Sequence, residues 1–335
     1  MSRPAVWLLF VALCGHSVLA AGDTSIARGV VGGEFTYVVR KGDTLTSISA
    51  RFGVSEKILA RENRLGRPYR LRPGNQLKVA NLHLVPQALA DGILINIPQR
   101  MLFLLRDAKV VNAYPVSLGR HDWQTPTGSF FILSREENKT WIVPPSIQEE
   151  MRRAGRPILT RVPPGPDNPL GRYWMGLSVP GYGIHGTNAP ASIYRMRTHG
   201  CIRLHPDDAE ALYGQVSLNM PVKIIYAPVL VAALEDRPIL VEVNPDVYNR
   251  GVDALRALHD IAREQGLEAD IDWTMAAKLA REKEGLARAA GNAVPGREAG
   301  GNEGTIAGNE REPALVYPLQ RLARAGGACI ATSSR

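Results

Sequence analysis

Short β-prone runs broken by turn residues set the strongest limit on what this chain can fold into. Between residues 92 and 227, runs such as ILINIP, MLFLLR, GSFFILS and PVKIIYA are separated by Pro, Gly, Asp and Asn. This pattern predicts short strands joined by tight turns. One helix is expected in PDDAEALYGQV, because Pro206 and two aspartates suit a helix N-terminus. The sequence therefore predicts a mainly β domain with few helices over residues 92–227.

A second, smaller unit is predicted over residues 36–80. It opens with the β-prone run YVV and closes with the turn and strand of LRPGNQLKV. Between them, Asp43 is placed to cap a helix with apolar residues at helical spacing, and Gly53 is placed to end it. Ser55 is placed to cap a second short helix. The order β-α-α-β in so few residues predicts a compact domain.

This unit resembles a LysM domain from end to end. The resemblance is carried by YVVRKGDTLTSISARFGV, by Asn63 after the second helix, and by LRPGNQLKV. It implies binding of the N-acetylglucosamine-containing glycans of peptidoglycan or chitin. A packing module without a ligand is the alternative.

Residues 1–20 have the pattern of a cleavable secretory signal peptide. They start with Arg3, continue with an apolar stretch from Ala5 to Leu13, and end on small residues. We therefore expect an exported protein, and a buried N-terminal helix is the alternative. The apolar stretch is too short to span a membrane, and no other stretch predicts a transmembrane segment.

The C-terminal third predicts a strand, helices and a tail. Over residues 228–290, RPILVEVNP is strand-like, VDALRALHDIAREQGL has an apolar helical face, and DIDWTMAAKLAREKEGLARAA predicts a second helix. Residues 291–335 are rich in Gly, Asn, Glu, Arg and Ala with little to bury, which predicts a disordered tail.

Charge and cysteine content limit the class of partner. The formal net charge of +8 suggests an anionic partner, but no long block of Lys and Arg points to nucleic acid. The chain has three cysteines, of which Cys14 lies in the predicted signal peptide, so a disulfide scaffold is not expected. Cys329 lies in the tail, where we expect an exposed residue without a role.

The candidate reactive residues lie in the stretch RMRTHGCIRLH, in which Cys201 lies between His199 and His205. If the stretch forms a strand, these three side chains and Arg203 share one face. The two histidines and Cys201, together with His185, could hold zinc. A guanidinium beside the thiolate would repel a cation, however, so no metal and no cofactor is predicted.

A nucleophilic thiol explains the stretch better than a metal site. Cysteine needs a base to take its proton, and His185, in YGIHGTN, is far enough upstream to return on a neighbouring strand. Arg203 adds positive charge and suits a substrate carboxylate. Gly200 leaves room for backbone N–H groups to act as an oxyanion hole. A buried core thiol is the alternative.

The same residues resemble a known catalytic domain. The stretch HGTNAPASIYRMRTHGCIRLHPDDA, with TPTGSF upstream, is similar to the signature of the L,D-transpeptidase catalytic domain of the YkuD type. The resemblance implies a β-sandwich-like fold and a role for each matching residue. Cys201 is the nucleophile, His185 the general base, the Gly186 carbonyl the group that orients it, and His199 and Gly200 the oxyanion region.

For substrate contacts, the resemblance implies Arg203, Thr187, Thr198 and Tyr194. Thr198 stands where many members have serine, and it keeps the hydroxyl. Tyr194 stands where many members have glycine, a departure that bears on the shape of the substrate loop. His205 and His121 are expected to have structural roles.

The implied reaction is a two-step acyl transfer on peptidoglycan in the periplasm. The Cys201 thiolate attacks the carbonyl of the third residue of a tetrapeptide stem and releases D-alanine, and an amine then takes the acyl group. The acceptor stays open between another stem peptide (a 3-3 cross-link), the lysine of an outer-membrane lipoprotein, and water in a carboxypeptidase. A non-catalytic wall-binding protein is a further alternative.

Overall fold

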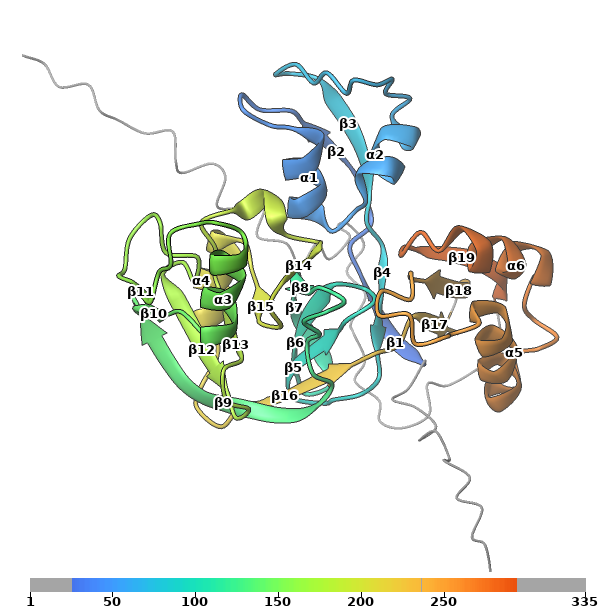
Figure 1. Cartoon of the computed structure of the whole chain (residues 1–335). Helices are drawn as coiled ribbons and strands as arrows, with labels where there is room; N and C mark the ends of the chain where they lie inside the picture. Colours follow the sequence, from blue (N-terminus) through green and yellow to red (C-terminus); the bar gives the residue numbers. More distant parts are fainter. Residues whose placement is uncertain (1–25, 236, 294–335) are drawn as a thin grey trace, which may run out of the picture.

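The computed structural model describes residues 26–235 and 237–293, arranged as three units (Figure 1). The β-α-α-β unit lies at the top, a large curled sheet lies below it, and a small α/β unit lies beside them. The predicted signal peptide at 1–20, residues 294–335 of the predicted tail, and with them Cys14 and Cys329, lie outside the described residues. Within the described ranges, none of the helices combines the length and the apolar character of a membrane span.

The large unit is built on an eight-stranded sheet with the strand order β15-β13-β12-β9-β16-β5-β6-β7. Most neighbours are antiparallel, but β13 pairs with β15, and β5 with β16, in parallel. Short strands predominate and helices are few, so the predicted mainly β fold class is confirmed. The strands are β5 (Gly92–Asn96), β6 (Met101–Arg106), β7 (Lys109–Pro115), β9 (Gly128–Glu137), β12 (Tyr173–Leu177), β13 (Gly183–His185), β15 (Ile202–Arg203) and β16 (Pro221–Ile225).

The centre of this sheet is covered on both faces. In β5, Ile93 and Ile95 belong to one core and Leu94 to another, because successive side chains of a strand point to opposite faces. The first core also takes side chains from β12, β13 and helix α4 (Pro206–Tyr213), so the curled sheet encloses it. Strands buried on both faces are apolar throughout, which explains the runs ILINIP and MLFLLR.

The N-terminal unit has the predicted β-α-α-β order. Gly53 ends the first helix in a left-handed conformation, and Ser55 caps the second, both as predicted. The two strands pair in antiparallel fashion. The elements are β2 (Glu34–Val38), α1 (Leu45–Phe52), α2 (Glu56–Glu62) and β3 (Gln76–Ala80).

The predicted cap of α1 was wrong by one residue. Thr44, not Asp43, is the N-cap, and it exchanges side-chain hydrogen bonds with Ser47 in a capping box. The Asp43 carboxylate instead accepts hydrogen bonds from the Tyr37 hydroxyl and the Arg40 N–H, both 2.7 Å away. Asp43 therefore ties the β2–α1 loop to the strand rather than to the helix.

The C-terminal unit corrects one further prediction. The second helix was predicted to run to about residue 290, but α6 ends at Glu282, where Lys283 adopts a left-handed conformation. The following segment pairs with β18 as a strand, so a tertiary contact overrides the helix propensity of its alanines. The elements are β17 (Val229–Ala232), β18 (Pro238–Val243), α5 (Ala254–Gln265), α6 (Trp273–Glu282) and β19 (Ala287–Ala293).

A buried polar network joins the three units. Glu242 on β18 is fully buried and accepts hydrogen bonds from the Leu84 N–H (2.6 Å) and from Gln99 Nε2 (3.0 Å). Asn244 Nδ2 and Nδ1 of His83 also lie 3.2 Å from its carboxylate, and Nε2 of His83 lies 3.1 Å from the Gly53 carbonyl oxygen. Leu84 and His83 lie on β4 (His83–Pro86), which pairs with β1 (Ala27–Val31). The network fixes how the N-terminal unit sits on the other two.

Loss of this carboxylate should destabilise the whole chain. Glu242→Ala removes the partner of Nδ1 of His83 and of the Leu84 N–H in the interior, which should lower the free energy of unfolding by about 3 kcal/mol. Urea denaturation followed by circular dichroism measures this. Glu34→Ala removes an exposed pair with Lys78 and is the control, with an expected loss below about 1 kcal/mol. Equal, small losses in the two variants would contradict a structural role for the network.

Candidate active site

A cleft of about 640 Å³ lies between the sheet and a short helix, α3 (Pro145–Arg153). Side chains of β9 and β12 form its floor. Residues singled out from the sequence also line it, from β13, β14 (Met196–Thr198), β15 and the turn between the last two. The structure thus brings together His185, Thr198, His199, Cys201 and Arg203.

Cys201 follows a turn that requires glycine. Gly200 has a φ of +105°, and a Cβ there would lie 2.5 Å from the Tyr182 ring, so any other residue would be strained and would collide. The Thr198 hydroxyl donates to the Cys201 carbonyl (2.6 Å) and accepts from the Gly200 N–H (3.2 Å). Because of this turn, HGCIRLH is not the continuous strand considered above, and β15 is two residues long. The thiol is half-buried and lines the cleft.

His185 is fixed by strand register. β13 lies between β12 and β15, which places His185 opposite Trp174 on one side and Arg203 on the other. The buried ring stacks on Trp174, with centroids 5.7 Å apart. Nδ1 lies 2.7 Å from the Gly186 carbonyl oxygen, which accepts but cannot donate. Nδ1 therefore carries the proton of the neutral ring, and Nε2 carries the free lone pair.

Burial dominates the acid–base properties of the pair. It lowers the pKa of His185 to about 4, aided by the positive charge of Arg203 and opposed by neighbouring backbone carbonyls. Burial also raises the pKa of the Cys201 thiol, against the smaller effects of a backbone N–H and of Arg203. At neutral pH the cleft therefore holds a neutral imidazole and a protonated thiol.

Arg203 brings a positive charge into the cleft and has no acidic partner among the described residues. Its Nη1 donates to the Ser192 hydroxyl (3.0 Å), while Nε is buried without a hydrogen-bond partner in the described part of the chain. Burial lowers the pKa of Arg203, but a guanidinium stays protonated in proteins. Since buried donors are normally satisfied, this group suits an acceptor on a ligand.

His199 is held at the rim of the cleft by α3. Its Nε2 lies 2.6 Å from Glu150 Oε2, and its ring packs edge-on against Trp123 with centroids 4.9 Å apart. Glu150 also accepts from Arg120 (3.2 Å), and the His199 and Arg120 contacts lower the pKa of Glu150 to about 2. The His199 side chain thus holds α3 over the cleft. Only the backbone N–H of His199 is then left to serve the predicted oxyanion region.

The wall formed by α3 was not predicted from the sequence. No residue of α3 is buried, yet Ile147 and Met151 line the cleft together with Trp174. Pro145 at the start of the helix and the run SIQEEMRR could have marked a short helix. The contact of Glu150 with His199, in the turn before Cys201, however, spans 49 residues and leaves no local pattern.

Tyr194 and Thr187 do not line the cleft. Tyr194 has a φ of +63° and is buried, with its ring 4.2 Å from the guanidinium carbon of Arg100. The Thr187 hydroxyl accepts from the Ala189 N–H in the turn after β13. Neither residue is among those that line the cleft, and their predicted contact with a substrate stays a prediction. They shape the loop that leads from His185 back to β14.

The two remaining histidines lie outside the lining of the cleft. His205 caps α4 by accepting from the Asp207 N–H, and His121 is exposed. Among the described residues, no group of three or more His, Cys, Asp or Glu side chains is placed to hold a metal ion.

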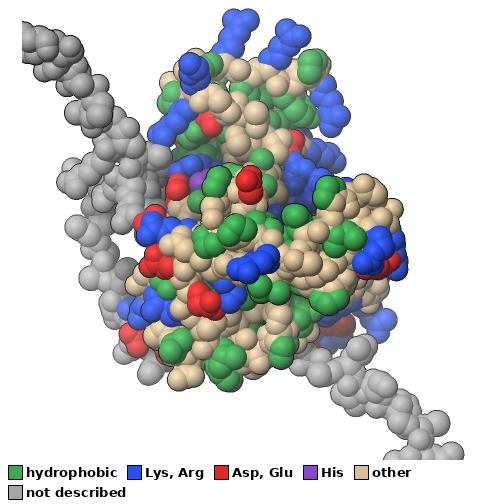
Figure 2. All heavy atoms as spheres, turned by 60° about the vertical axis from the view of Figure 1, so that its left-hand side comes forward, with side chains coloured by type: hydrophobic (Ala, Val, Ile, Leu, Met, Phe, Trp, Pro, Cys, Tyr) green, Lys and Arg blue, Asp and Glu red, His purple; other side chains and the backbone are tan. Residues whose placement is uncertain are grey.

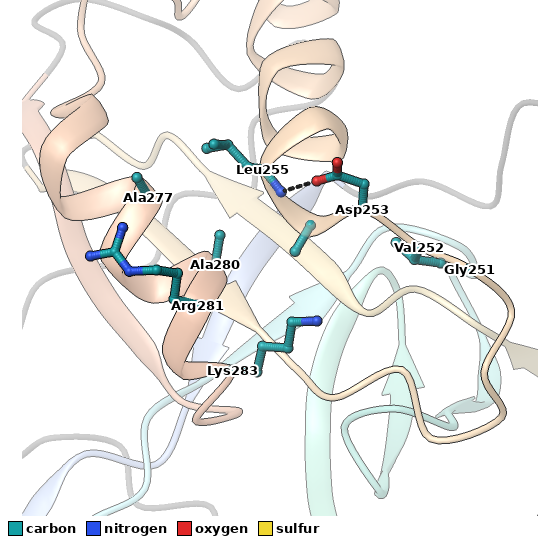
Figure 3. A pocket seen from close by; sticks show the side chains of 9 residues that line it. Gly251, Val252, Asp253, Leu255, Ala277, Ala280, Arg281 and Lys283 are labelled. Atoms are coloured by element: carbon teal, nitrogen blue, oxygen red, sulfur yellow. Dashed lines mark hydrogen bonds between the residues drawn. The ribbon is translucent and has the colours of Figure 1, made fainter.

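A second hollow, of about 530 Å³, lies in the C-terminal unit between the start of α5 and α6 (Figure 3). Its charged side chains are Asp253, Arg281 and Lys283. The Asp253 carboxylate accepts from the Leu255 N–H and so caps α5. No cysteine or histidine lines this hollow, so the cleft at Cys201 is the candidate active site.

Comparison with known proteins assigns this chain to a protein family. Residues 90–224 match the family model of the L,D-transpeptidase catalytic domain, YkuD, and residues 37–80 match that of the LysM domain. A curled β domain of the L,D-transpeptidase type thus follows a LysM domain. The chain belongs to the L,D-transpeptidase family.

Individual relatives agree with this assignment. The chain is 33% identical over 216 residues to the probable L,D-transpeptidase YcfS of Escherichia coli, covering 63% of this chain and 68% of that protein. It is 34% identical over 192 residues to the putative L,D-transpeptidase YkuD of Bacillus subtilis, covering 56% and 98%. Among solved structures, the catalytic domain of an E. faecium L,D-transpeptidase is similar at 23% identity with a TM-score of 0.33, covering 42% and 100%.

Alkylation of Cys201 should follow the raised pKa of its thiol. The rate of reaction with iodoacetamide is expected to rise about tenfold per pH unit up to and beyond pH 9.0, the ordinary pKa, because burial keeps the thiol protonated. Mass spectrometry of the peptide that contains Cys201 separates this rate from that of the other cysteines. A rate that levels off below about pH 7 would contradict the neutral pair and indicate a thiolate–imidazolium pair.

Proposed function

We propose that the chain is a peptidoglycan L,D-transpeptidase whose nucleophile is Cys201. The observation that carries this proposal is the meeting of three groups in one cleft: the Cys201 thiol, the His185 imidazole and the unpaired guanidinium of Arg203. They supply a nucleophile, a base and a counter-charge for a substrate carboxylate. The substrate is a tetrapeptide stem, cleaved between its third residue, a diamino acid, and the terminal D-alanine.

In the first step, Sγ of Cys201 attacks the carbonyl carbon of the third residue. Because Nδ1 of His185 donates to the Gly186 carbonyl, Nε2 is the nitrogen that takes the thiol proton. Gly186 thereby holds the ring in the useful tautomer. The amide C–N bond then breaks, His185 gives the proton to the nitrogen of the departing D-alanine, and a thioester remains on Cys201.

The neutral state of the pair favours a coupled proton transfer. With the pKa of His185 near 4 and that of the thiol raised, a separated thiolate and imidazolium are disfavoured before the attack. The proton therefore moves to His185 as the S–C bond forms. This makes the thiol selective for a carbonyl that the cleft holds in place, and slow toward reagents that need a free thiolate.

The oxyanion of the intermediate forms beside the turn at Gly200. The Gly200 N–H already donates to the Thr198 hydroxyl, so the backbone N–H groups of His199 and Cys201 are the proposed donors. The Thr198 hydroxyl is itself committed to the Cys201 carbonyl. Thr198 is therefore proposed to hold the turn in shape rather than to contact the substrate.

Arg203 is proposed to bind a carboxylate of the stem peptide. Its buried, unpartnered Nε and its charge suit a two-point contact with a carboxylate. Because Arg203 lies two residues after Cys201, this contact would fix the distance between the carboxylate and the carbonyl under attack. Arg197, exposed at the same cleft, adds positive charge near the entrance.

An amine completes the reaction by attacking the thioester: the C–S bond breaks, and the proton of the amine passes through His185 to Sγ of Cys201, which restores the thiol. We propose an amine of a second stem peptide, which gives a 3-3 cross-link, or the lysine side chain of an outer-membrane lipoprotein. The LysM unit would hold the enzyme on glycan strands. The predicted signal peptide would deliver it to the periplasm, where both acceptors occur.

Incubation with disaccharide-tetrapeptide muropeptides, followed by mass spectrometry, tests the proposal. Release of D-alanine together with 3-3 linked dimers is expected from the wild-type chain. Cys201→Ala should lower the rate by about a thousandfold or more, because it removes the nucleophile. His205→Asn is the control: asparagine also caps helices, and the residue lies outside the lining of the cleft, so activity should be retained. Release of D-alanine or formation of dimers by Cys201→Ala would contradict the proposal.

The products also identify the acceptor. Tripeptide and free D-alanine without dimers would show a carboxypeptidase. Transfer to an added lysine-containing peptide in preference to a second muropeptide would show lipoprotein anchoring. Binding to wall polymer with no release of D-alanine at all would show a non-catalytic wall-binding protein.

A further inference from the structure

The positive charge of this chain is concentrated in its LysM unit. Residues 36–80 hold ten lysines and arginines against three aspartates and glutamates, so they carry seven of the eight net positive charges. The other 290 residues hold 30 basic and 29 acidic side chains and are nearly neutral. The charge is therefore a property of one unit and not of the whole surface.

Within the unit, the charge gathers at the end that points away from the rest of the molecule. Two loops, 39–44 and 63–75, lie side by side there, joined by hydrogen bonds from the Val39 N–H to the Asn75 carbonyl and from the Gly74 N–H to the Val39 carbonyl, both 2.8 Å. Lys and Arg side chains stand out around this end of the upper lobe (Figure 2). We call these two loops the basic tip; its exposed cations are Arg40, Lys41, Arg64, Arg67, Arg70 and Arg72.

The cations of the basic tip have no acidic partners within the part of the chain that the structure describes. None of the six forms an ion pair among the described residues, whereas Arg61, on the side of the unit that faces the C-terminal unit, pairs with Glu284. The Arg67 guanidinium lies over the Tyr69 ring, 5.4 Å from its centroid, and its Nε donates to the Tyr69 hydroxyl (3.2 Å). An anionic partner would supply the counter-charge that these exposed cations lack within the described part of the chain.

We infer that the basic tip binds the free carboxylates of stem peptides on the wall polymer, and so makes this LysM unit select peptide-bearing strands over neutral glycan. The inference rests on the proposed function, which supplies a carboxylate-bearing polymer as substrate. A neutral glycan such as chitin gives the six cations no counter-charge. A polymer with carboxylates at every stem gives each cation a partner without requiring one fixed spacing.

Rigid attachment of the LysM unit makes this selectivity useful for the reaction. Glu56 on α2 pairs with Arg195, which directly precedes β14, and the Arg61–Glu284 pair and the buried Glu242 network fasten the other side. Contact of the basic tip with stems on one strand would therefore hold the cleft in a set orientation toward stems nearby. It would also bring the enzyme to regions of the wall where uncleaved stems are dense.

Sedimentation with insoluble polymers tests the inference, with the full chain carrying Cys201→Ala so that no covalent product forms. The polymers are intact peptidoglycan sacculi, sacculi whose carboxylates have been converted to amides with carbodiimide, and chitin. Intact sacculi should bind about tenfold tighter or more than the amidated sacculi and chitin, and this advantage should shrink between about 50 and about 300 mM NaCl, because screening weakens exposed charge contacts.

Two triple variants locate the effect. Arg40→Glu, Arg70→Glu and Arg72→Glu together should abolish the preference for intact sacculi while leaving chitin binding unchanged, which also shows that the unit is folded. Lys109→Glu, Arg256→Glu and Lys278→Glu change the net charge equally at exposed sites elsewhere and should keep the preference. Equal affinity for intact and amidated sacculi would overturn the inference, as would an equal loss in both triple variants. The soluble muropeptide reaction is unaffected by either outcome, so it tests the proposed function separately.

Discussion

The parallel pairing of β13 with β15 is the constraint on which the rest of the site depends. It sets His185 directly beside Arg203, and Cys201, the residue just before β15, lines the same cleft. Burial under this arrangement keeps the imidazole and the thiol neutral, and the left-handed turn at Gly200 shapes the backbone that would receive the oxyanion. The groups proposed as nucleophile, base and counter-charge thus take their positions from one strand register and one glycine.

Outside the cleft, the same sheet supports a second layer of organisation. The central strands are buried on both faces, so one face encloses the catalytic core while the other carries the LysM and C-terminal units. A fully buried carboxylate, Glu242, holds these units through hydrogen bonds that reach β4 and the segment after β5. A buried charge of this kind is tolerated where it is fully hydrogen-bonded, and it then favours one relative placement of the units. The LysM unit is therefore a fixed part of the molecule, and its charged tip has a defined direction.

Local signals in the sequence were sufficient for much of this structure. The caps at Gly53 and Ser55, the apolar strands and the helix led by His205 depend on neighbours in sequence, and they were predicted. The pairing of Cys201 with a distant His185 was predicted because both lie in motifs with a chemical reason to meet.

The contact of Glu150 with His199 was missed, since it joins residues with no shared pattern. Tyr194, for which the resemblance implies a substrate contact, is buried with its ring beside the Arg100 guanidinium, and a contact spanning 94 residues of sequence leaves no local pattern. Likewise, the alanine-rich segment after α6 was predicted to be helical but forms β19, because it pairs with β18.

The central claim is that Cys201 is an acylable thiol activated by His185. Intact-protein and peptide mass spectrometry after incubation with a carbapenem, an acylating agent with a carboxylate, measures it most directly. The account predicts one adduct per chain on Cys201, none in Cys201→Ala, and an adduct that forms about a hundredfold more slowly in His185→Gln. An adduct on another residue, or an unchanged rate in His185→Gln, would contradict it.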